Sequence, residues 1–149
     1  MIWATPAEVR AYLDDGEIPE AVTDERLQRM IDNCVDTLES RIVYWPVLDE
    51  ETDRAADEQQ RRRIVGAVAE TVKARYEAKN LAAQLGGDGL TEVIAAGGSV
   101  TAGKLSVSGG SKSGGSGGAK IGQAANRVPV AALEKLLAAG LVGGGGVTW

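Results

Sequence analysis

The amino-acid sequence predicts a mainly α-helical fold, in which a small helical bundle with two long antiparallel helices is followed by a β-hairpin and a short C-terminal helix. Two stretches, 23–42 and 54–85, carry apolar residues at intervals of three and four, the spacing that places side chains on one face of an α-helix. The composition then changes abruptly, because 18 of the 20 glycines lie from residue 86 onward. We therefore expect four segments: a helical body over 1–88, a β-hairpin arm over 89–108, a Gly/Ser-rich flexible linker over 109–127, and a docking helix with its tail over 128–149.

The first helix is predicted from a capping sequence. Thr5 can accept hydrogen bonds from the first N–H groups of a helix, and Pro6 suits the first helical position. Glu8 stands three residues after Thr5 and completes a capping box. Val9, Tyr12 and Leu13 then form an apolar side at helical spacing, and Asp14-Asp15-Gly16 is expected to end the helix.

A second helix is expected to begin near Thr23 and to end at Trp45-Pro46, because proline disfavours helical geometry in the residue before it. Seven apolar residues form its predicted buried stripe: Leu27, Met30, Ile31, Cys34, Val35, Leu38 and Ile42. Cys34 lies within this stripe, so we interpret it as a small buried core residue and not as a reactive thiol.

The longest helix is expected from about Arg54 to Leu85, with one buried stripe and with Glu58 and Arg62 as an exposed ion pair. At about 1.5 Å per residue it would be on the order of 48 Å long, so we expect part of it to pack on a neighbouring subunit. The acidic residues 49–53 before it lack the alternating ligands and central glycine of a calcium loop, and we interpret them as solvated. The run 61–63 of three arginines lies among acids and is interpreted as a solvated helix face.

Shorter elements are expected after residue 86. Residues 99–108 alternate around an Ala102-Gly103 turn, which predicts a β-hairpin. Residues 109–118 are glycine, serine and one lysine, and such a segment cannot build a core. Residues 129–139 form an amphipathic pattern that ends at Gly140, which predicts the C-terminal helix.

Composition and charge argue against several classes of function. Without histidine, serine-histidine triads and most zinc sites cannot form, although carboxylate or lysine chemistry remains open. Residues 1–85 hold 18 acidic and 11 basic side chains, so the body is acidic and is not suited to bind DNA along its phosphates. The single cysteine fits a reducing compartment, and neither a signal peptide nor a membrane-spanning run is apparent. We therefore expect a chain made in a cytoplasm, with no membrane partner.

Two sequence patterns that suggest chemistry are not supported by their surroundings. Gly98–Lys104 matches the first seven positions of a phosphate-binding P-loop, but the eighth position is Leu105 where serine or threonine would hold magnesium. The residues that follow are not helical, although a P-loop must open a helix. The carboxylates, for their part, lie among basic residues on predicted exposed faces and form no catalytic pair.

The order of these parts resembles the head-to-tail adaptor (connector, or head-completion) family of long-tailed bacteriophages. Three pieces carry the resemblance: 23–41, from Thr-Asp-Glu-Arg-Leu to Leu-Glu-Ser-Arg; the hairpin 99–107; and 128–137, Val-Pro-Val-Ala-Ala-Leu-Glu-Lys-Leu-Leu. The resemblance covers most of residues 5–140. The glycine-serine stretch 109–118 and the glycine-rich end depart from the usual pattern of the family.

The resemblance implies a structural protein of the virion that is not an enzyme and needs no cofactor or metal. It implies a homo-oligomeric, dodecameric ring beneath the portal protein, which extends the DNA channel and receives the stopper or tail-completion protein. Double-stranded DNA would pass through this ring without specific binding. The chain would assemble in the host bacterial cytoplasm and remain at the head-tail interface.

Seven apolar side chains are the candidate protein-interaction residues: Val100, Leu105 and Val107 in the hairpin, Leu133, Leu136 and Leu137 in the C-terminal helix, and Trp149 at the end. We expect the hairpin to meet a neighbouring subunit or the tail side, and the C-terminal helix and tail to meet the portal. The alternative for the helix residues is packing in the core. Alternative functions are another tail-completion or minor capsid assembly protein, or a nucleotide-binding regulator that uses Gly98–Lys104.

Overall fold

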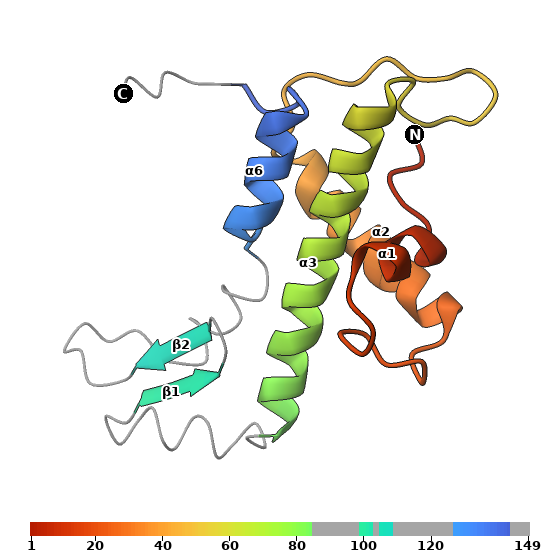
Figure 1. Cartoon of the computed structure of the whole chain (residues 1–149). Helices are drawn as coiled ribbons and strands as arrows, with labels where there is room; N and C mark the ends of the chain where they lie inside the picture. The colour runs from red at the N-terminus through yellow and green to blue at the C-terminus, as the bar shows by residue number, and fades with distance from the viewer. Residues whose placement is uncertain (85–98, 103–104, 109–126, 144–149) are drawn as a thin grey trace. The chain divides into compact units, whose positions relative to one another are not determined.

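The computed structural model describes residues 1–84, 99–102, 105–108 and 127–143. Its elements are, in chain order, α1 (Pro6–Tyr12), α2 (Asp24–Glu39), α3 (Glu58–Gln84), β1 (Ser99–Ala102), β2 (Leu105–Ser108) and α6 (Val130–Ala138) (Figure 1). The prediction of a mainly helical chain is therefore confirmed. The chain divides into two compact units, one of residues 1–73 and 128–149 and the other of residues 74–127.

Helix α1 begins with the predicted capping box. The Thr5 hydroxyl accepts a hydrogen bond from the Glu8 N–H at 3.4 Å, and Glu8 Oε2 accepts one from the Thr5 N–H at 2.9 Å. The second oxygen of the same carboxylate, Oε1, accepts from Arg54 Nη1 at 2.7 Å. Glu8 thus holds the start of α1 and also fastens it to the loop that precedes α3.

Helix α2 begins where it was predicted, because the Thr23 hydroxyl accepts a hydrogen bond from the Arg26 N–H at 3.3 Å. Its stripe faces the core, and Cys34 is fully buried, as predicted. The helix ends at Glu39, however, and not at Trp45-Pro46. Two tight turns follow it, and the N–H groups of Val43 and Tyr44 then donate to the carbonyl of Leu141 at 2.7 and 3.0 Å. The carbonyl of Leu141, which is distant in sequence, thus accepts the hydrogen bonds that a continuing helix would direct to its own carbonyls.

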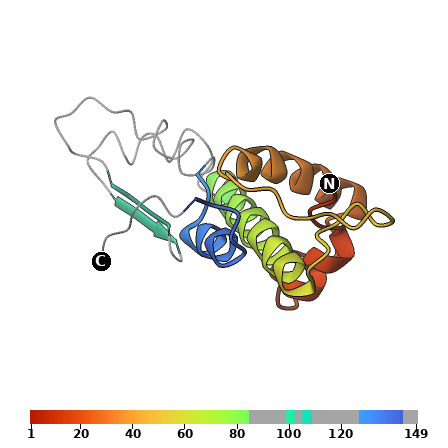
Figure 2. The same cartoon turned by 90° about the horizontal axis from the view of Figure 1, so that it is seen from above.

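Helix α3 begins at Glu58, later than the predicted Arg54, because the carboxylate of Asp57 accepts a hydrogen bond from the Gln60 N–H at 2.7 Å and caps the helix there. Arg62 makes the predicted ion pair with Glu58 at 2.8 Å. The residues predicted for the buried stripe of α3 within residues 64–72 are buried, namely Ile64, Val65, Val68, Ala69 and Val72. Burial extends beyond one stripe, since eight of the nine residues 64–72 are buried. In this stretch α3 lies between α6 on one side and α1 and α2 on the other (Figures 1 and 2).

The close approach of three helices depends on Gly66 of α3. A Cβ atom at this position would lie 2.8 Å from Cδ of Lys135 on α6 and 3.0 Å from Cε2 of Tyr12 on α1. The Lys135 ammonium lies 5.1 Å from the centroid of the Tyr12 ring, within the range of a cation-π interaction. The Tyr12 hydroxyl donates to Glu70 on α3 at 3.3 Å.

Helix α6 is packed into the same unit as the N-terminal helices, although the sequence predicts a separate docking segment here. Ala132, Leu136 and Leu141 are buried at 1% exposure or less. At the end of α6, Gln60 of α3 donates to the carbonyl of Ala139 at 2.8 Å. Gly140 follows with a φ of +73°, the left-handed conformation that commonly terminates a helix.

Strands β1 and β2 pair in antiparallel fashion and belong to the second unit. Residues 105–108 are a strand, whereas a P-loop would open a helix at this place. The predicted linker 109–118 and the glycine-rich end from residue 144 lie outside the described residues.

Candidate interaction surface

The predicted docking residues of α6 divide between the core and the surface. Leu136 is fully buried, and Leu133 is half-buried. Leu137, by contrast, is 54% exposed, and Val130 at the start of the helix is 71% exposed. For Leu136 the structure therefore matches the alternative interpretation, packing in the core, and Leu137 is the predicted residue of α6 that faces solvent.

The other predicted interaction residues lie in the second unit or at the end of the chain. Val100 of β1 is the cross-strand partner of Val107 of β2, and Leu105 is the partner of Ala102. Trp149 lies outside the described residues. The roles predicted for these residues remain predictions.

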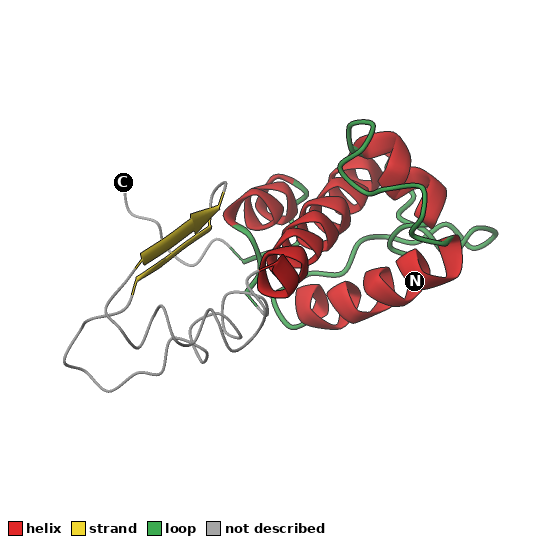
Figure 3. Ribbon diagram, turned by 90° about the horizontal axis from the view of Figure 1, so that it is seen from below, coloured by secondary structure: helices red, strands yellow, loops and turns green. Residues whose placement is uncertain are grey.

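A second apolar surface was missed in the sequence analysis. Of the nine large apolar side chains that are exposed in the described part of the chain, five lie within residues 43–48, Val-Tyr-Trp-Pro-Val-Leu. We call this stretch the 43–48 segment. Trp45 is 58% exposed and Val47 is 78% exposed, while Pro46 between them is buried. The segment belongs to the long loop that joins α2 to α3 (Figure 3).

The backbone at the start of the 43–48 segment is fastened to the end of α6. The N–H groups of Val43 and Tyr44 both donate to the carbonyl of Leu141, a residue whose side chain is 1% exposed. A Cβ atom at Gly143 would lie 3.4 Å from Cγ2 of Val43, so the two backbones approach closely. The segment is thus anchored to a buried part of the fold.

The backbone after Trp45 is held as well. Leu48 forms an isolated β-bridge with Ala55, which is 3% exposed, and Val47 accepts a hydrogen bond from the Ala56 N–H at 2.8 Å. Asp49 donates its N–H to the carbonyl of Arg54 at 2.8 Å. With both ends held, the exposed side chains are presented on an ordered backbone, which lowers the entropy lost on binding.

An acidic turn adjoins the 43–48 segment. One carboxylate oxygen of Asp49 accepts hydrogen bonds from the N–H groups of Glu51 and Thr52, both at 2.9 Å, and from the Thr52 hydroxyl at 3.1 Å. These bonds, led by the one from the Thr52 N–H, hold the pKa of Asp49 below its usual value. The turn leaves the side chains of Glu50 and Glu51 exposed beside the apolar surface.

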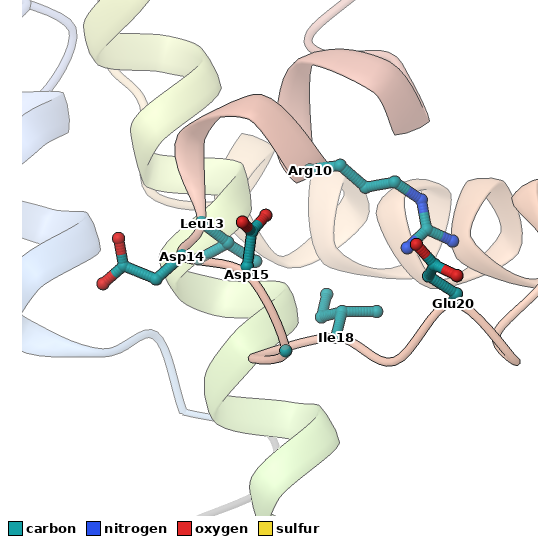
Figure 4. Close-up of a pocket in the computed structure, with 7 residues that line it drawn as sticks. Arg10, Leu13, Asp14, Asp15, Ile18 and Glu20 are labelled. Atoms are coloured by element: carbon teal, nitrogen blue, oxygen red, sulfur yellow. The ribbon is translucent and has the colours of Figure 1, made fainter.

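A hollow of about 400 Å³ lies elsewhere, at the turn after α1 (Figure 4). Its lining includes Arg10, Asp14, Asp15 and Glu20. Arg10 donates to Asp24 Oδ1 at 3.3 Å and to the carbonyl of Val22, so this guanidinium fastens α1 to the start of α2. The basic group of the lining is therefore engaged in contacts of the fold, and we assign the hollow no ligand.

One sequence signal could have identified the 43–48 segment. Its apolar residues follow neither the helical repeat nor the alternation of a half-buried strand, and four acids come within the next five residues. Where such an apolar run is exposed and has a polar border, it is typical of an interaction site.

No protein-family model matches this chain, and neither the curated proteins nor the solved structures include a significant match. Among the helices of the described residues, none is both long enough and apolar enough to cross a membrane. Within the same residues, no group of three or more histidine, cysteine or acidic side chains is placed to hold a metal ion.

Proposed function

We propose that this chain is a structural subunit of a phage head-to-tail adaptor, a ring that joins the portal of the capsid to the stopper or the tail. The observation that supports an assembly role is the exposed 43–48 segment on its anchored backbone. Tyrosine and tryptophan are enriched among the residues that dominate the binding energy of protein interfaces. The assignment to the adaptor family rests on the resemblance in the order of elements.

The lengths and charges of the described elements support the proposal. Helix α3 has 27 residues, which corresponds to about 40 Å and suits lateral packing between the subunits of a ring. The unit formed by residues 1–73 and 128–149 holds 18 acidic and 10 basic side chains. Such a negative body suits a channel through which double-stranded DNA passes without adhering.

The proposal assigns a binding partner to each contact region. The hairpin arm over 89–108, which includes β1 and β2, serves contacts between subunits or with the tail. Leu137 and Val130 on the exposed side of α6 serve the portal contact. The 43–48 segment adds a further surface, which we assign to a different protein of the head-tail interface.

Mass spectrometry and electron microscopy of intact phage particles test the proposal. We expect the chain to be present in every particle, as a ring at the junction of head and tail. Absence from intact particles would contradict the proposal. Location at another place on the particle would contradict it too, and would favour the alternative of a tail-completion or minor capsid protein.

A paired variant makes the test specific to the 43–48 segment. Tyr44→Ser with Trp45→Ser removes two exposed aromatic side chains and leaves the charge unchanged. We expect a folded protein, checked by circular dichroism, that yields filled heads and separate tails instead of joined particles. Joined particles at the normal yield would show that the segment does not carry the assembly contact.

A further inference from the structure

The charges around the 43–48 segment indicate what kind of surface it meets. Residues 49–53 contain four acidic side chains, and Glu50 and Glu51 are exposed next to Val47 and Leu48. Because they follow Leu48 within three residues, a partner that covers Val47 and Leu48 comes close to these carboxylates. Complementary potentials favour such an encounter, whereas like charges brought together cost several kcal/mol.

A second copy of the helical body does not meet this requirement. The unit has 18 acidic and 10 basic side chains, so a second copy offers few basic side chains to face these carboxylates. A two-fold contact of the segment with itself would bring the acidic residues 49–53 of both copies into one interface. Four basic side chains of the unit are already engaged in ion pairs within the chain: Arg10 with Asp24, Arg54 with Glu8, Arg62 with Glu58, and Lys73 with Glu17.

The anchored backbone lowers the cost of binding a partner. The hydrogen bonds from Val43 and Tyr44 to Leu141, and the bridge between Leu48 and Ala55, hold the backbone of the segment at both ends. A surface that is held in this way loses little conformational entropy when a partner covers it. The partner therefore has to supply an apolar surface but does not have to order the segment.

We infer that the 43–48 segment, together with Glu50 and Glu51, binds an apolar surface bordered by lysine and arginine side chains on a protein other than this chain. The inference rests on the proposed function in one respect, that the segment is a protein-binding surface. It adds the chemistry of the partner: apolar at the centre, basic at the rim, and different from the body of this subunit.

Two labelled peptides of about 15 residues probe this chemistry on the full chain. Both are amphipathic helices with one leucine face, and the rest of the surface is lysine in one peptide and glutamate in the other. Fluorescence anisotropy should show that the lysine peptide binds at least about tenfold more tightly than the glutamate peptide. A rise in salt should weaken the lysine peptide without abolishing its binding, because the apolar contact remains.

Three paired variants locate the binding. Trp45→Ser with Val47→Ser removes apolar surface at constant charge, and Glu50→Gln with Glu51→Gln removes charge at constant apolar surface. We expect each pair to weaken the lysine peptide about fivefold or more. Asp14→Asn with Asp15→Asn makes the same change of charge at the hollow after α1, and we expect an effect below about twofold.

Several results would overturn the inference. These are equal affinity for the two peptides, no binding of the lysine peptide, or an equal loss in the Asp14/Asp15 and Glu50/Glu51 variants. Sedimentation could also overturn the inference. If the chain self-associates and the Trp45/Val47 variant does not, the partner of the segment is a second copy of this chain. The comparison of the two peptides on the unmodified chain remains decisive if a variant fails to fold.

The peptide and particle experiments fail independently. A ring at the head-tail junction with no charge preference for peptides would contradict only the basic border of the partner surface. A clear preference in a protein that is absent from particles would contradict only the adaptor role.

Discussion

Replacement of Leu136 by alanine tests whether α6 belongs to the core of the helical body. Leu136 is 0% exposed, while its neighbour Leu137 is 54% exposed. At about 0.8 kcal/mol for each buried methylene, the loss of burial alone amounts to about 2.4 kcal/mol for the three carbon atoms removed. The cavity left behind adds to this, so we expect the free energy of unfolding to fall by about 3–5 kcal/mol.

Leu137→Ala is the matched control, because it makes the same chemical change on the same helix with the same change of helix propensity. Its side chain is half exposed, and we expect a loss below about 1 kcal/mol. Urea unfolding followed by circular dichroism measures both values, with the slope against urea unchanged. A loss below about 1 kcal/mol for Leu136→Ala, or equal losses for the two variants, would refute the packing of α6 and return Leu136 to the candidate docking residues.

Three further predictions concern the contacts of single side chains. Glu8→Ala removes both the capping box and the ion pair with Arg54, and should lower the free energy of unfolding, measured in urea, by about 1–2 kcal/mol. Glu8→Gln keeps a hydrogen-bond acceptor and should lower it by less than half as much. Asp49 should titrate by NMR below its usual pKa of about 3.9. Because the pKa is lowered in the folded state, the stabilising contribution of Asp49 is present above the unfolded pKa and is lost as the pH falls through the folded pKa. The free energy of unfolding of Asp49→Asn should therefore depend less on pH below about pH 4 than that of the unmodified chain. The hydrogen bond that Lys73 donates to the Glu17 carboxylate is the main cause of a lowered pKa at Glu17 as well. Lys73→Met should therefore raise this pKa toward its usual value of about 4.3, and an unchanged NMR titration would contradict the contact.

The features that the sequence predicts correctly depend on residues that are close together along the chain. The capping box of Thr5 and Glu8, the cap at Thr23 and the ion pair of Glu58 with Arg62 each join residues three or four positions apart. Such contacts form whenever the helix forms, so they can be identified from spacing alone. The burial of Cys34 follows in the same way from its place within an apolar stripe.

The end of α2 could not be predicted by the same reasoning. Trp45-Pro46 is a clear stop signal, yet the helix ends at Glu39, because the N–H groups of Val43 and Tyr44 donate to the carbonyl of Leu141. Nothing near residue 40 in the sequence indicates this partner. The same hydrogen bonds turn a predicted helix end into the anchored 43–48 segment, and the candidate surface was therefore missed.

The sequence by itself determined the helical class of this protein, the starting points of α1 and α2, and the change of composition after residue 85. The tertiary structure decided which apolar side chains leave water. Leu136 and Leu137 have the same chemistry and adjacent positions, but Leu136 is buried in the helical body and Leu137 is 54% exposed. Val47 and Val68 differ in the same manner, at 78% and 0% exposure, because burial depends on what the rest of the chain packs against each residue.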